Sequence, residues 1–215
     1  MVSHGVSGGN SRVAAKRMKA KICLVGEQAV GKTSLIRRYV LDEFSDDYIA
    51  TMGAKVTKKN VEIKHDSLGN VQVNLVIWDI MGDKGFRDLL REAYFQGAQG
   101  IMAVCDVTRK ETLTDLRSWI EAVSRVSGRI PTQVLANKID LTHEMQFSET
   151  DVKGISGFYE SRYLLTSAKT GENVENAFIE MARAVVDKRV TPSSVWEKQF
   201  PAMTSQQPLK VARKV

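Results

Sequence analysis

Residues 21–34 read KICLVGEQAVGKTS, and this stretch decides the fold. A short apolar run at 21–25 leads into the pattern G-x-x-x-x-G-K-[ST], and the amphipathic segment SLIRRYV follows. A strand, a glycine-containing loop and a helix in this order are typical of a phosphate-binding loop, in which backbone N–H groups at a helix N-terminus surround a phosphate. The sequence therefore predicts a P-loop nucleotide-binding protein.

Each position of this loop has an expected role in binding phosphate. Gly26 and Gly31 let the backbone wrap tightly, so that successive N–H groups point at the β-phosphate. Lys32 supplies a positive charge to the β- and γ-phosphates, and the Thr33 hydroxyl is an expected ligand for Mg²⁺. The predicted nucleotide contacts in the loop are Gly26, Gln28, Ala29, Val30, Gly31, Lys32, Thr33 and Ser34.

Beyond the loop, apolar runs alternate with segments of helical periodicity. Strands are expected at 21–25, 55–63, 71–78, 100–105, 132–136 and 162–166, and helices at 32–41, 86–95, 111–127, 149–160 and 172–188. Turn residues in HDSLGN indicate a hairpin between the second and third strands, whereas helices separate the others and imply parallel crossovers. We predict an α/β fold with a mostly parallel six-stranded sheet, one antiparallel edge strand, and helices on both faces.

The tetrapeptide NKID at 137–140 indicates which base is bound. The Asp140 carboxylate can accept hydrogen bonds from the N1–H and the 2-amino group of guanine. Adenine lacks this donor pair and would leave a buried charge unpaired. Asn137 can bridge the loop to its neighbours and contact the base, and the stem of Lys138 can cover one ring face. The motif therefore predicts guanine specificity.

A second tetrapeptide, TSAK at 166–169, follows the expected strand RYLLT. The backbone N–H of Ala168 can meet the 6-oxo group of guanine. With NKID it completes the predicted base site, which consists of Asn137, Lys138, Asp140, Ser167, Ala168 and Lys169.

The order and spacing of these motifs resemble those of the Ras superfamily of small GTPases, nearest to the Rab branch. The likeness covers about residues 20–187 and rests on GEQAVGKTS, YIATMG (48–53), WDIMG (78–82), NKID and TSAKTGENVENAF (166–178). It implies a protein that binds GTP, GDP and Mg²⁺, switches between the two nucleotide states, and recruits effectors in the GTP state.

The resemblance also implies roles for residues outside the phosphate loop. Thr51 would hold Mg²⁺ and the γ-phosphate, Phe44 would stack on guanine, and Asp79 would hold Mg²⁺ through water. The Gly82 N–H would meet the γ-phosphate. Effectors, an activator and an exchange factor would bind through residues 46–53, Trp78 and residues 80–92, although a strand tryptophan that packs on its neighbours explains Trp78 equally well.

The chain departs from the family pattern at several places. Ala29 stands where the Rab branch usually has glycine, and GAKV at 53–56 replaces the usual G-V-D-F. The spacing from Thr51 to Asp79 is several residues longer than in Rab or Ras proteins, with the excess expected in the hairpin around Gly69. No cysteine for lipid attachment follows the last helix. These departures suggest either a prokaryotic relative, with an archaeal one among the options, or else a truncated chain.

The largest departure is Asp83, which stands where the family has a glutamine that orients the attacking water. An ionised aspartate is shorter and only accepts hydrogen bonds. Its charge near the γ-phosphate would cost on the order of 1–4 kcal/mol at ~4–6 Å. We therefore expect slow intrinsic hydrolysis, with catalytic positions at Lys32, Thr51, Gly82 and Asp83. Two alternatives remain open: Asp83 points to solvent and a partner positions the water, or the aspartate was introduced by engineering to block turnover.

Three functions are compatible with these motifs. The first is a GTPase switch with slow turnover. The second is a hydrolysis-deficient, GTP-bound scaffold or interaction module. The third is an ATP-dependent P-loop enzyme, against which NKID argues. Single-turnover GTP hydrolysis separates the first two.

The net charge of +6 comes from the two ends of the 215-residue chain. Residues 1–21 hold five basic residues and no acidic one, and residues 190–215 hold four basic residues and one acidic one. The stretch between them is slightly acidic, so we expect no nucleic-acid-binding core. The expected organisation is a basic disordered extension at 1–19, a small GTPase domain at 20–189 and a basic flexible tail at 190–215.

Targeting signals are not visible in the sequence. The N-terminus has no apolar signal region, and no apolar run is long enough to span a bilayer. Val2 does not fit a myristoylation signal, and the C-terminal KVARKV holds no cysteine for prenylation. Cys23 and Cys105 lie in apolar runs and are expected to be buried thiols in a reducing compartment. We expect a cytoplasmic protein without a lipid anchor, with at most weak electrostatic membrane contact through its basic ends.

Overall fold

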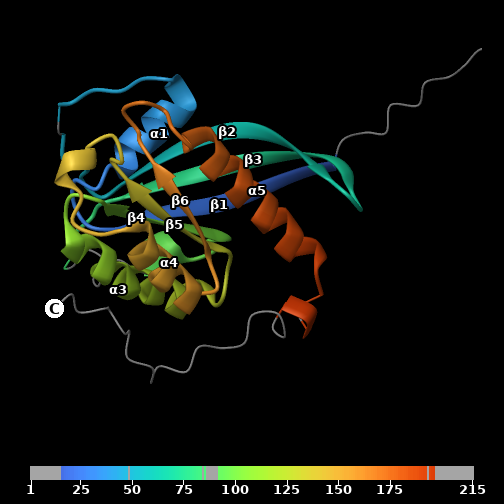
Figure 1. The fold of residues 1–215 in the computed structure, drawn as a ribbon. Coiled ribbons are helices and arrows are strands. Elements are labelled where there is room, and N and C mark those ends of the chain that lie inside the picture. Colours follow the sequence, from blue (N-terminus) through green and yellow to red (C-terminus); the bar gives the residue numbers. More distant parts are fainter. Residues whose placement is uncertain (1–15, 48, 84, 86–91, 193, 197–215) are drawn as a thin grey trace, which may run out of the picture.

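The computed structural model describes residues 16–47, 49–83, 85, 92–192 and 194–196. Six strands form one sheet in the order β2-β3-β1-β4-β5-β6, with β2 antiparallel to β3 and every other pair parallel (Figure 1). The predicted fold class is therefore confirmed, including the antiparallel edge strand.

The described strands and helices follow the alternation expected from the sequence. The strands are β1 (Lys16–Val25), β2 (Ala54–His65), β3 (Gly69–Ile80), β4 (Gly100–Asp106), β5 (Thr132–Asn137) and β6 (Arg162–Thr166). The helices are α1 (Lys32–Leu41), α3 (Lys110–Ser127), α4 (Glu149–Phe158) and α5 (Val174–Val190), with a short 3₁₀ helix at Thr142–Glu144. Of the helix expected at 86–95, residues 92–95 are helical and 86–91 lie outside the described residues.

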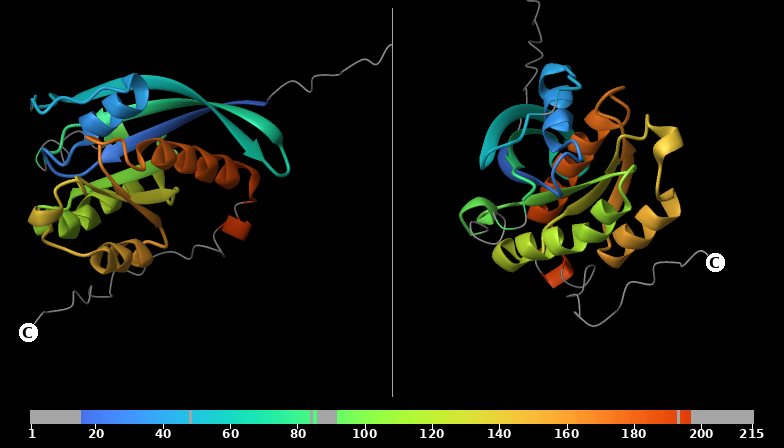
Figure 2. Two further views of the ribbon diagram at one scale, coloured as in Figure 1. Left: turned by 45° about the horizontal axis from the view of Figure 1, so that its top comes forward. Right: turned by 90° about the vertical axis from the view of Figure 1, so that its left-hand side faces the viewer.

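Two helical layers cover the sheet because successive residues of a strand point to opposite faces. Ile22 and Leu24 of β1 belong to the core beneath α1 and α5, where Tyr39 and Phe178 stack with ring centroids 4.1 Å apart. Cys23 belongs to the core beneath α3 and α4 on the opposite face (Figure 2). Both cysteines are free and buried. Among the described residues, no helix is long and apolar enough to cross a membrane.

The N-terminal boundary differs from the prediction. β1 begins at Lys16 rather than at residue 21, and its residues 16–19 pair with residues 71–74 of β3. Residues 16–19 therefore belong to the sheet and not to a disordered extension, while residues 1–15 lie outside the described residues. The physical reason is the length of β3, which reaches far enough to give these residues hydrogen-bond partners.

The hairpin between β2 and β3 lies between Thr51 and Asp79, in the stretch where extra residues are expected from the sequence. The two strands pair from Ala54–Ile80 out to His65–Gly69, where Gly69 adopts a left-handed φ of 70°. At the other end of the chain, α5 ends at Val190 and residues 194–196 form a helical turn. In this turn the Trp196 ring lies 5.5 Å from the Lys188 amino group, so the start of the expected flexible tail contacts α5.

Candidate functional site

A cleft of about 410 Å³ opens at the carboxyl ends of the parallel strands, where the loops that follow β1, β5 and β6 meet. This is the edge at which open α/β sheets bind their ligands. Of the predicted site residues, the cleft is lined by Gln28, Ala29, Gly31, Lys32, Thr33, Ser34, Phe44, Thr51, Gly82, Asn137, Lys138, Asp140, Ala168 and Lys169. Five predicted site residues do not line the cleft: Gly26, Val30, Asp79, Asp83 and Ser167.

The phosphate loop depends on two glycines that leave no room for a side chain. A Cβ on Gly26, whose φ is 137°, would lie 2.1 Å from the Val104 carbonyl oxygen. A Cβ on Gly31, whose φ is 99°, would lie 2.2 Å from Nδ2 of Asn137. Both contacts are with groups that are fixed in the core, so the loop packs directly on the strand ends.

Ala29 adopts a left-handed backbone conformation with φ at 60°. An alanine in this conformation costs roughly 1–2 kcal/mol, which a glycine would not. The glycine that the resemblance to the Rab branch leads us to expect at this position would adopt this conformation without that cost.

The Lys32 amino group is buried and donates hydrogen bonds to the Gly26 and Glu27 carbonyl oxygens, each at 2.7 Å. Burial lowers the pKa of Lys32 to about 8, although nearby Asp79 and Glu27 oppose that effect. A buried cation without a full counter-charge is stabilised when an anion arrives. The position and charge of Lys32 therefore suit a bound polyphosphate.

Three oxygen-bearing side chains meet at one corner of the cleft. Thr33 Oγ1 donates to Asp79 Oδ2 at 2.5 Å and lies 3.0 Å from Thr51 Oγ1. Asp79 is only 2% exposed, and its Oδ1 has no hydrogen-bond partner among the described residues. Burial raises the Asp79 pKa, with the Thr33 hydrogen bond and Lys32 acting in the opposite direction. Hard oxygen ligands around a buried carboxylate fit Mg²⁺.

Asn137 joins the three loops of the cleft through its buried side chain. Its Nδ2 donates to the Val30 carbonyl oxygen at 2.9 Å, and its Oδ1 accepts from Thr166 Oγ1 at 3.3 Å and from the Ala168 N–H at 3.2 Å. The Ala168 N–H, expected to face the guanine 6-oxo group, thus already has a partner. Nearby, Ser167 Oγ donates to Asp140 Oδ1 at 2.6 Å and orients that carboxylate.

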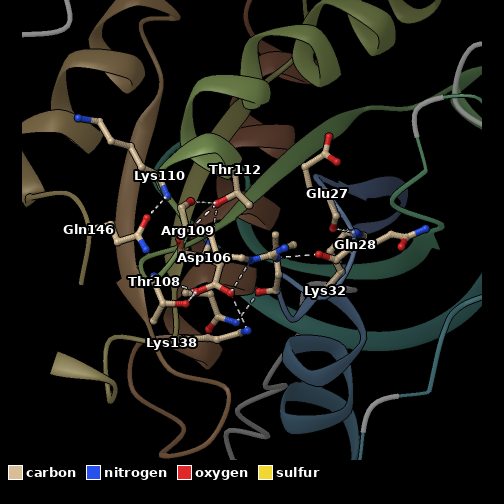
Figure 3. Close-up of polar contacts among 12 residues, drawn as sticks. Glu27, Gln28, Lys32, Asp106, Thr108, Arg109, Lys110, Thr112, Lys138 and Gln146 are labelled. Carbon is tan, nitrogen blue, oxygen red and sulfur yellow. Dashed lines mark hydrogen bonds and ion pairs between the residues drawn. The ribbon is translucent and has the colours of Figure 1, made fainter. Parts of the chain in front are cut away.

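A polar network centred on Asp106, at the end of β4, was not expected from the sequence (Figure 3). Asp106 is 1% exposed and lies 2.6 Å from the Lys138 amino group and 3.2 Å from Nε of Arg109. Burial would raise the Asp106 pKa, but hydrogen bonds from Lys138 and Thr108 outweigh it, so the pKa is lowered. The only sequence signal was an acidic residue directly after a buried strand, next in the sheet to the strand that carries the phosphate loop.

The same network fixes the phosphate loop to α3. Arg109 Nη2 donates to the Gln28 carbonyl oxygen at 2.7 Å, and Trp119 Nε1 donates to Glu27 Oε1 at 2.9 Å. Asp106 holds the Lys138 amino group in place. Lys138 also lines the cleft, so its aliphatic stem is fixed along this side.

The expected switch surfaces border the cleft. Phe44 is half-buried in the cleft wall, and Ile49 and Met52 are 77% and 90% exposed. Trp78 is half-buried and packs against the Lys21 amino group at 3.9 Å and against Tyr94, which supports its interpretation as a packed strand residue. Asp83 is half-buried and lies outside the cleft wall. Residues 48, 84 and 86–91 lie outside the described residues.

A phosphate loop after the first strand of a parallel sheet, with a hydroxyl–carboxylate corner beside it, defines a P-loop nucleotide-binding protein. The model of the Ras family matches residues 21–187, and the chain belongs to this family. It is similar to Ras-related protein Rab-8 of Diplobatis ommata, with 34% identity over 169 residues that cover 78% of each chain.

Two further relatives show the same degree of likeness. Ras-related protein Rab-8A of Rattus norvegicus is 33% identical over 178 residues, or 81% of this chain and 83% of its own. Ras-related protein Rab-8B of Homo sapiens is 33% identical over 169 residues, or 78% of this chain and 79% of its own. The chain is therefore a Ras-superfamily GTPase near the Rab branch, as the motifs predicted.

The clearance around Gly26 gives a first prediction. Gly26→Ala places a methyl group against the Val104 carbonyl and forces a left-handed alanine, so we expect the free energy of unfolding to fall by about 2–4 kcal/mol. Chemical denaturation measures it. Gly69→Ala is the matched control, because Gly69 also has a positive φ but has nothing within 4 Å of a Cβ. Equal losses in the two variants would contradict the packing described for Gly26.

Proposed function

We propose that this chain binds GTP and GDP with Mg²⁺ in the cleft and switches between the two nucleotide states. The observation that carries the proposal is the corner formed by Thr33, Thr51 and Asp79, which joins the phosphate loop to the two segments expected to move. Thr33 and Thr51 would hold Mg²⁺ directly and Asp79 through water. The ion supplies charge neutralisation at the phosphates.

Guanine is the proposed base because Asp140 presents a carboxylate that Ser167 already orients. The Asn137 side chain fixes the distance between this loop and the phosphate loop. The Ala168 N–H contacts Asn137 Oδ1 at 3.2 Å, a long hydrogen bond that an incoming base oxygen can share. Phe44 lines the same cleft as Asp140 and is available to cover the base.

The proposed switch follows from two contacts with the γ-phosphate. Thr51 lies within hydrogen-bonding distance of Thr33, and Gly82 packs against the phosphate loop at Glu27. Both would hold the γ-phosphate, and both contacts are lost with GDP. The neighbouring exposed side chains of Ile49 and Met52 form an apolar surface suited to effectors and regulators.

Hydrolysis is proposed to be slow because Asp83 replaces the glutamine expected after Gly82. An ionised carboxylate cannot donate a hydrogen bond to the γ-phosphate, and its charge repels the phosphate oxygens. In phosphoryl transfer most catalysis comes from positioning and charge neutralisation, so a misplaced negative charge acts on the barrier itself. A scaffold that stays bound to GTP is the limiting case of the same argument.

The base assignment predicts the effect of Asp140→Asn. The amide can donate to a 2-oxo group but cannot pair with both guanine donors, so GTP should bind more weakly and xanthosine triphosphate more tightly. Competition against a fluorescent guanine nucleotide measures both affinities. An unchanged preference for GTP over the xanthine nucleotide would contradict the role of Asp140.

The switch assignment predicts where backbone protection depends on the nucleotide. Hydrogen exchange should differ between the GDP-bound and GTP-analogue-bound protein in residues 46–53 and 80–92, because their γ-phosphate contacts exist in only one state. Residues 111–127 of α3 serve as the internal reference and should change little. Equal protection of the two segments in both states would favour the scaffold over the switch.

The rate assignment predicts the effect of substitutions at Asp83. Asp83→Gln should raise single-turnover GTP hydrolysis with little change in nucleotide affinity, because the effect belongs to the transition state. Asp83→Ala separates the causes: a faster alanine variant indicates charge repulsion, whereas an alanine variant as slow as the parent indicates water alignment. A glutamine variant no faster than the parent at saturating Mg²⁺ would refute the assignment.

A further inference from the structure

We propose that Gln28 supplies the side-chain amide that orients the hydrolytic water, in place of the glutamine that is missing at position 83. The proposal rests on the function proposed above, because it needs GTP in the cleft. From the sequence, only the backbone of the phosphate loop is expected to contact the nucleotide at this position, whereas the proposal gives the Gln28 side chain a catalytic role.

The backbone of Gln28 lies directly against the residue that precedes Asp83. A Cβ placed on Gly82 would be 2.6 Å from the Gln28 backbone nitrogen and 2.5 Å from the Glu27 carbonyl carbon and oxygen. Gln28 and Gly82 also line the same cleft, together with Thr51. A side chain from position 28 therefore starts beside the loop from which a glutamine at position 83 would start, and it can reach the same end of the phosphate chain.

The Gln28 side chain is also available for this role. The residue is exposed, and its amide makes no hydrogen bond with any of the described residues. In Figure 3 the side chain extends away from Arg109, so the contact between the two residues occupies only the Gln28 carbonyl. The amide therefore keeps both its donor and its acceptor free for a water and a phosphate oxygen.

The Gln28 main chain is held from behind. Arg109 Nη2 donates to the Gln28 carbonyl oxygen at 2.7 Å, and Arg109 Nε is paired with the buried Asp106 at 3.2 Å. The neighbouring Glu27 accepts from Trp119 on α3. Only the side-chain torsions of Gln28 remain to be fixed when GTP binds, which reduces the entropy cost of placing the amide. Arg109 acts through Gln28 and is a positioning residue.

The chemistry requires only hydrogen bonds from the glutamine. The side-chain oxygen of Gln28 accepts a hydrogen bond from the water, and the side-chain nitrogen donates to a γ-phosphate oxygen. The water oxygen forms a bond to the γ-phosphorus while the bond to the β–γ bridging oxygen breaks. The proton of the water passes to the released phosphate, and GDP leaves with the bridging oxygen. Because the amide is neutral, it adds none of the repulsion that Asp83 brings.

Single-turnover GTP hydrolysis with saturating Mg²⁺ tests the proposal. Gln28→Ala should slow the reaction roughly 10- to 100-fold, the scale expected when a reactant loses its alignment. The affinities for fluorescent GDP and for a non-hydrolysable fluorescent GTP analogue should change by less than about threefold, since the amide acts on the transition state. Gln72→Ala is the matched control. It removes a glutamine side chain from β3 about 23 Å along the strand from Asp79 and so away from the cleft, and its hydrolysis rate should equal that of the parent.

The positioning role of Arg109 needs a double-mutant cycle. Arg109→Ala should slow hydrolysis when Gln28 is present and should have no further effect in the Gln28→Ala background. Additive losses in the double variant would mean that Arg109 acts on the phosphate loop generally and would overturn its role through Gln28.

The remaining outcomes separate this proposal from the function on which it rests. A Gln28→Ala variant that is as fast as the parent or faster overturns the catalytic role, and a faster variant shows that the side chain obstructs the attack. A parent protein that binds GTP without hydrolysing it also overturns the role of Gln28 but leaves the nucleotide assignment intact. A parent protein that does not bind GTP overturns both.

Discussion

The buried side chain of Asn137 is the contact on which the rest of the cleft depends. One amide holds the phosphate loop through the Val30 carbonyl and the loop after β6 through Ala168 and Thr166. Only glycine fits at position 31, because the Asn137 amide group occupies the space that a Cβ would need. Because both the nitrogen and the oxygen of this buried amide are hydrogen-bonded, the amide has one favoured orientation, so the distance between the phosphate loop and Asp140 is set before any ligand arrives.

A second constraint comes from charge. Asp106 sits at the end of a fully buried strand and holds Lys138 from one loop and Arg109 from the start of α3. Removing either cation would leave a buried carboxylate poorly compensated, which is more costly than losing a surface ion pair. The network thus couples the loop after β5 to the backbone of Gln28. Buried ion pairs therefore fix the loops around the cleft before any ligand binds.

The sequence was informative where the chemistry is local. The phosphate loop, NKID and TSAK are short patterns whose roles depend mainly on residues that are adjacent in the sequence. The structure brings these three patterns together at one edge of the sheet. Helical periodicity located α3 and α5 to within two residues at each end. The length of β1 was missed because a strand of alternating basic and apolar residues resembles a solvated tail until its partner in β3 is known.

The Asp106 network was missed for a related reason. Its members come from β4, α3 and the loop after β5, and no spacing in the sequence shows that Arg109 reaches back to Gln28. The left-handed conformation of Ala29 was equally hidden, since alanine gives no local sign of a positive φ. Propensity and motif describe neighbours along the chain, whereas these features depend on packing between elements that only the folded sheet brings together.

The most direct test of the account is a titration of the nucleotide-free protein with GTP and with ATP, each in the presence of Mg²⁺ and again with the ion chelated. If the Asp140 carboxylate pairs with guanine, as proposed, and the corner formed by Thr33, Thr51 and Asp79 binds Mg²⁺, GTP should bind at least ~10⁴-fold more tightly than ATP. Chelation of the ion should also weaken the binding of GTP. Equal affinities for the two nucleotides, or GTP binding that is indifferent to Mg²⁺, would contradict this account.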